Sequence, residues 1–113
     1  MDTQGSGPES APVLQRCGIV FELATGRVSV RGRPVSLTRR ELQVLALLMA
    51  ANGRTMSAGA IQLRVWADAN SGSPSQVAMI VARLRRRLGN TRLIETIGGE
   101  GYRIASNEER FRP

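Results

Sequence analysis

Residues 73–90 limit the possible folds of this chain more than any other segment. The segment opens with Ser73-Pro74, a helix N-cap followed by proline at the first helical position, and Gln76 is placed to complete a capping box. It closes with Gly89-Asn90, a helix stop signal. Apolar residues recur inside it at steps of four, three and four: Val77, Val81, Leu84 and Leu88. We therefore predict a helix with one narrow apolar face, which must pack against other elements.

Two more helices precede this segment. A capping box of Thr38 and Glu41 begins a helix that ends at Asn52-Gly53, and a second helix runs from the Ser57 cap to about Trp66.

β-Structure is predicted on both sides of the helices. Residues 13–36 contain short β-rich and alternating runs, which predict a small antiparallel sheet, with 33–36 as an edge strand. Residues 93–97 and 102–105 flank the glycine-rich turn 98–101 and predict a hairpin. The expected fold class is α+β: an N-terminal antiparallel β-sheet, three helices and a C-terminal β-hairpin.

The length of 113 residues suits one domain, which we assign to residues 13–105. Residues 1–12 are rich in Gly, Ser, Pro and acidic residues and are expected to form a disordered linker or tail. Residues 106–113 are expected to form a flexible C-terminal tail, and the polar stretch 68–72 a loop.

The composition excludes most enzyme classes. All 16 Lys+Arg residues are arginine and histidine is absent, which removes the usual general base, imidazole metal ligands and Schiff-base chemistry. The one cysteine, Cys17, excludes an intrachain disulfide and is expected to be a small buried residue in a strand. We therefore expect no enzymatic activity, no metal, no cofactor and no small-molecule substrate.

The net charge of +7 favours a polyanionic partner, either nucleic acid or an anionic membrane. No apolar run approaches the ~20 residues of a spanning helix, and residues 1–12 lack a signal pattern, so we expect a cytoplasmic protein with no membrane partner. Residues 38–105 contain ten arginines and four acidic residues, a net charge of +6. The few scattered aromatic residues do not suit RNA base stacking, which leaves double-stranded DNA as the favoured partner.

The face of helix 74–88 opposite its apolar residues carries groups that suit base edges and phosphates: Ser75, Gln76, Met79, Ala82, Arg83, Arg86 and Arg87. Arg85 lies on the opposite flank. A solvated charged face is the alternative for an arginine run taken alone. A capped helix, a basic helix and a glycine-tipped hairpin in this order describe a helix-turn-helix with a β wing, and this context favours DNA binding.

This order of residues resembles the winged-helix DNA-binding domain of OmpR/PhoB-type response regulators. The similarity covers residues 13–105 and rests on an ordered set: Leu37-Thr38, Glu41, Leu45, Ser57, Val65-Trp66, Val77, Arg83-Leu84-Arg85, Leu88, Glu95-Thr96-Ile97 and Gly99-Glu100-Gly101-Tyr102-Arg103. The resemblance implies a four-stranded N-terminal sheet, three helices and a hairpin wing. It also implies a bacterial two-component system, with a head-to-tail dimer on direct repeats in promoter DNA.

The chain departs from this family at several positions. Ala78 stands where members usually have an acidic residue, and Ala82 and Gly98 stand where many have a basic one. The missing wing arginine weakens the case for minor-groove reading. The family's usual receiver domain has no counterpart in these 113 residues, which contain no aspartate cluster to accept a phosphoryl group.

We predict ten DNA-contacting residues: Trp66, Ser75, Gln76, Met79, Arg83, Arg85, Arg86, Arg87, Thr96 and Tyr102. Arg83 is expected to reach a base edge, and Arg86 and Arg87 to touch mainly the backbone. For Arg85, a backbone contact and an internal pair with Glu41 remain equal alternatives. Trp66 suits the core edge, a phosphate contact or both, and Thr96 and Tyr102 suit either hairpin packing or phosphate contact.

The leading function is a sequence-specific double-stranded DNA-binding transcription regulator, with helix 74–88 in the major groove and the hairpin wing on the adjacent backbone. The alternative is a winged-helix protein–protein interaction module of the transcription machinery, without base readout. RNA polymerase is a further candidate partner in either case.

Overall fold

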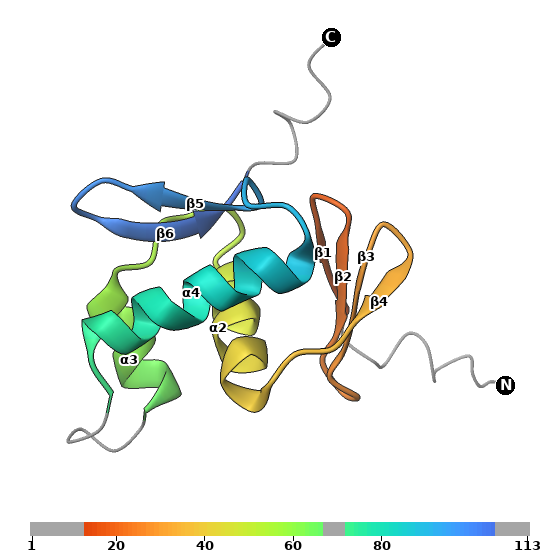
Figure 1. Cartoon of the computed structure of the whole chain (residues 1–113), viewed down its shortest axis with the longest axis horizontal. Helices are drawn as coiled ribbons and strands as arrows, with labels where there is room; N and C mark the ends of the chain where they lie inside the picture. Colours follow the sequence, from red (N-terminus) through yellow and green to blue (C-terminus); the bar gives the residue numbers. More distant parts are fainter. Residues whose placement is uncertain (1–12, 67–71, 106–113) are drawn as a thin grey trace, which may run out of the picture.

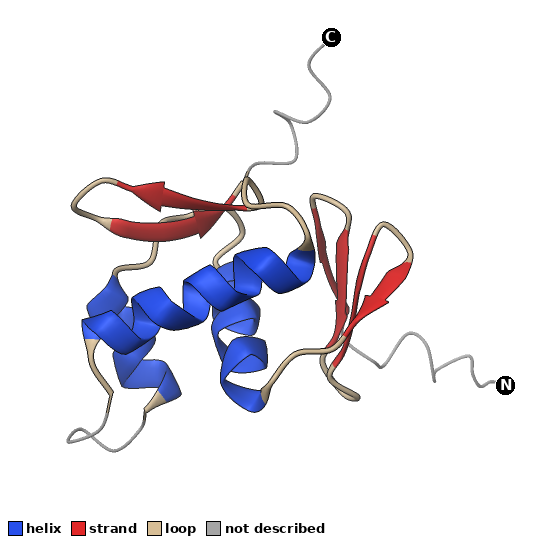
Figure 2. Cartoon of the chain, in the orientation of Figure 1, coloured by secondary structure: helices blue, strands red, loops and turns tan. Residues whose placement is uncertain are grey.

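The computed structural model describes residues 13–66 and 72–105. Within them the elements are β1 (Val13–Arg16), β2 (Ile19–Glu22), β3 (Arg27–Val30), β4 (Arg33–Val35), α2 (Arg39–Ala50), α3 (Ala58–Val65), α4 (Pro74–Leu88), β5 (Ile94–Ile97) and β6 (Gly101–Ile104). The β1–β4 sheet lies beyond the carboxyl end of α4, and the β5–β6 hairpin runs alongside the helices (Figures 1 and 2). This arrangement confirms the predicted α+β class. The expected tails, 1–12 and 106–113, and most of the expected loop 68–72 lie outside the described residues.

The N-terminal sheet is antiparallel throughout, with the strand order β1-β2-β3-β4. Ile19 pairs with Val30 and Phe21 pairs with Val28, so these four side chains share one face of the sheet. All four are buried and belong to the hydrophobic core that the helices complete.

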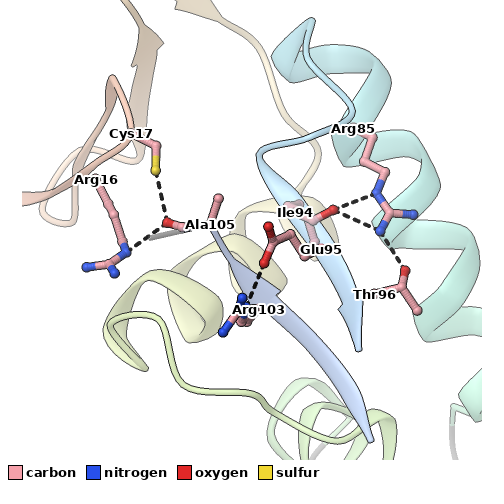
Figure 3. A network of polar contacts seen from close by, with 8 residues as sticks. All are labelled: Arg16, Cys17, Arg85, Ile94, Glu95, Thr96, Arg103 and Ala105. Atoms are coloured by element: carbon pink, nitrogen blue, oxygen red, sulfur yellow. Dashed lines mark hydrogen bonds and ion pairs between the residues drawn. The ribbon is translucent and has the colours of Figure 1, made fainter. Parts of the chain in front are cut away.

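Cys17 lies in the turn between β1 and β2, with a φ of 54°, and not in a strand as expected. Its predicted burial is confirmed, because it is 5% exposed. Its Sγ donates a hydrogen bond to the carbonyl oxygen of Ala105 at 2.9 Å, and Nε of Arg16 donates to the same oxygen at 3.1 Å (Figure 3). These two bonds join the N-terminal sheet to the chain segment that leaves the hairpin.

The first predicted capping box is present at the start of α2. The backbone N–H of Glu41 donates to the Thr38 hydroxyl at 3.2 Å, and Oε1 of Glu41 accepts from the Thr38 N–H at 2.9 Å. The box predicted at α4 is not completed. Ser73 accepts from the Gln76 N–H at 3.2 Å, but the Gln76 side-chain oxygen lies 3.4 Å from the Ser73 hydroxyl and not on its backbone N–H.

The apolar face of α4 is the centre of the core. The four residues of the predicted face are at most 1% exposed, and Ile80, which the spacing did not include, is 7% exposed. Gly89 then ends the helix in the left-handed conformation, with a φ of 80°, as its position predicts.

Replacing Leu84 with alanine tests this packing. Leu84 is completely buried, so Leu84→Ala should lower the free energy of unfolding by about 2–5 kcal/mol in a denaturant titration. Leu63 lies on α3 and is 67% exposed, so Leu63→Ala is the matched control and should cost less than about 0.5 kcal/mol. Equal losses in the two variants would show that the rotation of α4 is assigned wrongly.

Candidate nucleic-acid interface

The face of α4 that points away from the core is open to solvent. The side chains predicted to line it are all exposed: Ser75, Gln76, Met79, Ala82, Arg83, Arg86 and Arg87. Met79, near the middle of this surface, is 49% exposed although it is apolar. An exposed methionine flanked by a hydroxyl, an amide and guanidinium groups provides both apolar and hydrogen-bonding contacts.

The four arginines of α4 fall into two pairs. Arg83 and Arg86 form no hydrogen bond or ion pair with any residue in the described ranges, 13–66 and 72–105. Arg85 and Arg87, by contrast, are held by other parts of the fold. The first pair therefore presents guanidinium groups to which the protein itself offers no acceptor, and which a bound anion can engage.

Arg85 connects α4 to the hairpin. Its Nε and Nη2 atoms donate to the carbonyl oxygen of Ile94 at 3.0 and 2.9 Å, and Nη2 also donates to the Thr96 hydroxyl oxygen at 2.7 Å (Figure 3). The alternative in which Arg85 pairs with Glu41 is therefore wrong. Since Thr96 accepts this bond through its oxygen, its own O–H proton remains a donor at the exposed surface of the hairpin.

Arg87 is the true partner of Glu41. Its Nε lies 3.0 Å from Oε1 of Glu41, whose side chain is only 1% exposed, and the pair joins the end of α4 to the start of α2. Oε2 of Glu41 has no hydrogen-bond partner in the described part of the chain. Local sequence patterns did not indicate this pair, because Glu41 and Arg87 lie on separate helices that meet only in the folded chain.

Trp66 occupies the core edge, which is the first of its predicted roles. It is 8% exposed, and the guanidinium carbon of Arg40 lies 4.6 Å from the centre of its ring. Nη1 of Arg40 also donates to the carbonyl oxygen of Val65 at 2.7 Å. Arg40 was not singled out from the sequence, since nothing in its local pattern indicates a contact with the end of α3. A phosphate contact by Trp66 would have to use its small exposed edge.

The start of β6, next to the hairpin turn, is fixed beside the start of α3. Tyr102 is half-buried, and its backbone pairs in both directions with Met56, at 2.8 and 2.9 Å. Gly101 has a φ of 146°, and a Cβ there would overlap the Met56 carbonyl, so this position requires glycine. Across the hairpin, Nε of Arg103 lies 2.6 Å from Oε1 of Glu95. The structure therefore brings Thr96 and Tyr102 onto one rigid hairpin next to α4.

Residues 13–66 and 72–105 hold no group of three His, Cys, Asp or Glu side chains that could bind a metal ion. Among the helices found there, none has the length and apolar character needed to cross a membrane.

The sheet, three helices and hairpin define a winged helix-turn-helix domain. Residues 32–104 match the family model described as "Transcriptional regulatory protein, C terminal", and the chain belongs to this family. This is a family of transcription regulator domains and not of enzymes.

Curated relatives are bacterial regulators that are longer than this chain. The transcriptional regulatory protein CutR of Streptomyces coelicolor is 36% identical over 93 residues, which are 82% of this chain and 43% of CutR. The regulatory protein VanRB of Enterococcus faecalis is 37% identical over 78 residues, 69% of this chain and 35% of VanRB. The chain thus spans less than half the length of these relatives.

Solved structures that share the fold include two DNA-binding domains. The DNA-binding domain of CpxR from E. coli has a TM-score of 0.74 at 24% identity, covering 86% of this chain and 99% of that one. The Klebsiella pneumoniae RstA DNA-binding domain, solved in complex with the RstA box, has a TM-score of 0.73 at 21% identity, covering 82% and 96%.

Removing the Arg85 side chain tests its connecting role. Arg85→Met should lower the free energy of unfolding by about 1–3 kcal/mol, because the Ile94 carbonyl loses its donors. It should also speed amide hydrogen exchange in β5. Arg86→Met is the matched control and should change stability by less than about 0.5 kcal/mol. If both variants are as stable as the parent protein, Arg85 does not hold the hairpin to α4.

Proposed function

We propose that this chain binds double-stranded DNA in a sequence-specific manner and regulates transcription, with α4 in the major groove and the β5–β6 wing on the adjacent backbone. The observation that carries this proposal is the exposed face of α4. It combines base-reading side chains with two arginines, Arg83 and Arg86, that have no partner in the described part of the chain.

The side chains of this face suit the major groove. A groove about 12 Å wide accepts a helix, and its base edges offer acceptors, donors and thymine methyl groups. Gln76 suits the edge of adenine, and Met79 suits a thymine methyl group. Arg83 lies one turn after Met79, and its fork of donors suits O6 and N7 of guanine. Ser75 supplies a hydroxyl for a base or a phosphate.

Contacts with the DNA backbone would come from both sides of this face. Thr96, whose oxygen is occupied by Arg85, offers its proton to a phosphate oxygen, and Tyr102 offers a phenolic hydroxyl from the neighbouring strand. Arg86 would bind a phosphate near the carboxyl end of α4. Arg87 is 47% exposed, so it can face the backbone while it remains paired with Glu41. Gly98 and Glu100 at the wing tip supply no positive charge, which favours backbone contact over minor-groove reading.

The partners follow from this function. CutR and VanRB are named as regulators, and RstA was solved with its DNA box. We infer that the target of this chain is promoter DNA in the cytoplasm, that two copies bind head to tail, and that RNA polymerase is the protein partner.

The dependence of DNA binding on salt tests the proposal against the protein-interaction alternative. If four to five phosphates are neutralised, log K should fall against log salt with a slope of roughly −4. The measurement is a fluorescence-anisotropy titration of duplex DNA between low and physiological salt. A slope near zero would contradict DNA binding and favour the interaction module.

Substitution of two arginines on the same face of α4 should distinguish base reading from phosphate binding. Arg83→Ala should weaken binding to a selected site by about 1–3 kcal/mol and affect scrambled duplex far less. Arg86→Ala is the matched comparison, and it should weaken binding to both duplexes by similar factors. The selected site would come from repeated enrichment of random duplexes on the parent protein. If Arg83→Ala weakens binding to both duplexes equally, Arg83 contacts a phosphate and does not read a base.

A further inference from the structure

A cleft lies where the edge strand β4 meets the carboxyl end of α4. Its volume is about 340 Å³, and its lining includes Arg33, Ser36, Arg86, Arg87 and Gly89. The arginines come from segments far apart in the sequence, and Figure 1 shows the end of α4 beside the N-terminal sheet. Local sequence patterns do not predict that these arginines lie together. Residues 1–37 carry four arginines and three acidic residues, and this small net charge does not mark them as part of a basic surface.

The cleft contains more positive charge than the fold compensates. Glu41 pairs with Arg87, but Arg33 and Arg86 have no hydrogen bond or ion pair within residues 13–66 and 72–105. Arg33 reaches across toward the end of α4, since a Cβ built on Gly89 would lie 3.2 Å from Nη2 of Arg33. Like charges lining one cleft repel each other, and a bound anion relieves that repulsion.

The cleft continues the face of α4 proposed to enter the groove. Arg86 lies eleven residues after Ser75, and the helix rises 1.5 Å per residue, so the two are about 16 Å apart along the axis. This separation exceeds the roughly 12 Å width of the major groove. When the start of α4 contacts base edges in the major groove, its end therefore reaches the phosphates that border the groove.

We propose that this cleft binds a phosphodiester group of the DNA backbone, with Arg33 of the N-terminal sheet and Arg86 of α4 as the charged donors and Ser36 as a hydroxyl donor. The inference rests on the proposed DNA binding and extends its footprint to the N-terminal sheet. Arg33 thereby becomes a DNA-contacting residue outside the helix-turn-helix and the wing.

A purely structural role for Arg33 makes a different prediction. A positive charge beside the last turn of α4 interacts favourably with the negative end of the helix dipole and so stabilises the fold. Loss of that effect would lower the unfolding temperature and leave the salt dependence of DNA binding unchanged. The two roles are therefore separated by the salt slope and not by affinity alone.

The experiment compares Arg33→Ala with Arg27→Ala, a matched control on the same sheet. Arg27 is exposed and does not line the cleft. It lies at the start of β3, whereas Arg33 pairs with Val30 at the other end of that strand. Arg33→Ala should make the salt slope of duplex binding shallower by about 0.9, the value for one phosphate contact, and Arg33→Lys should restore it. It should weaken binding to selected and scrambled duplex alike, by about fivefold, the upper value for an exposed ion pair. Arg27→Ala should leave the slope unchanged.

A walk of neutral methylphosphonate linkages along the selected duplex locates the phosphate. One linkage at the border of the site should weaken binding of the parent protein and of Arg27→Ala equally. It should weaken binding of Arg33→Ala less, because only Arg86 and Ser36 remain there to hold the phosphate. An unchanged slope for Arg33→Ala, or a methylphosphonate effect that adds to that of Arg33→Ala at every linkage, overturns the proposal while DNA binding stands. Absence of duplex binding by the parent protein overturns the proposed function and this inference together.

Discussion

The burial of one face of α4 is the constraint on which the rest of the structure depends. Val77, Val81 and Leu84 are completely buried in the core that α2, α3 and both sheets surround. A helix is a rigid rod with 3.6 residues per turn, so fixing these positions fixes the direction of every other side chain on it. Met79, Arg83 and Arg86 are therefore held at the exposed face by the packing of the opposite face, and need no contacts from their own side chains.

Two arginines extend this constraint to the neighbouring elements. Arg85 holds β5 through Ile94 and Thr96, and Arg87 holds α2 through Glu41. The second contact also supplies the compensating charge without which a carboxylate that is 1% exposed would be costly to bury. Helix, wing and α2 thus form one preorganised surface, which reduces the entropy lost when that surface binds a ligand.

The elements could be predicted from the sequence because their signals are local. The Thr38–Glu41 capping box, the apolar face of α4 and the glycine that ends it all depend on neighbouring residues. The roles within the run Arg85, Arg86 and Arg87 could not be predicted, because successive residues of a helix differ by 100° and their partners lie in α2 and β5. The position of Arg33 could not be predicted for the same reason, because Arg33 comes close to Gly89 only when β4 packs beside α4.

The division of the α4 arginines into two pairs is the central claim, and the Nε–H signals of arginine in nitrogen–proton NMR spectra test it most directly. In the free protein, the Nε–H groups of Arg85 and Arg87 should exchange slowly with water, because both are bonded internally. Those of Arg83 and Arg86 should exchange rapidly, and addition of the selected duplex should slow and shift these two signals while the other two change little. Rapid exchange of Arg85 and Arg87 in the free protein, or protection of all four arginines only on DNA, would contradict the account.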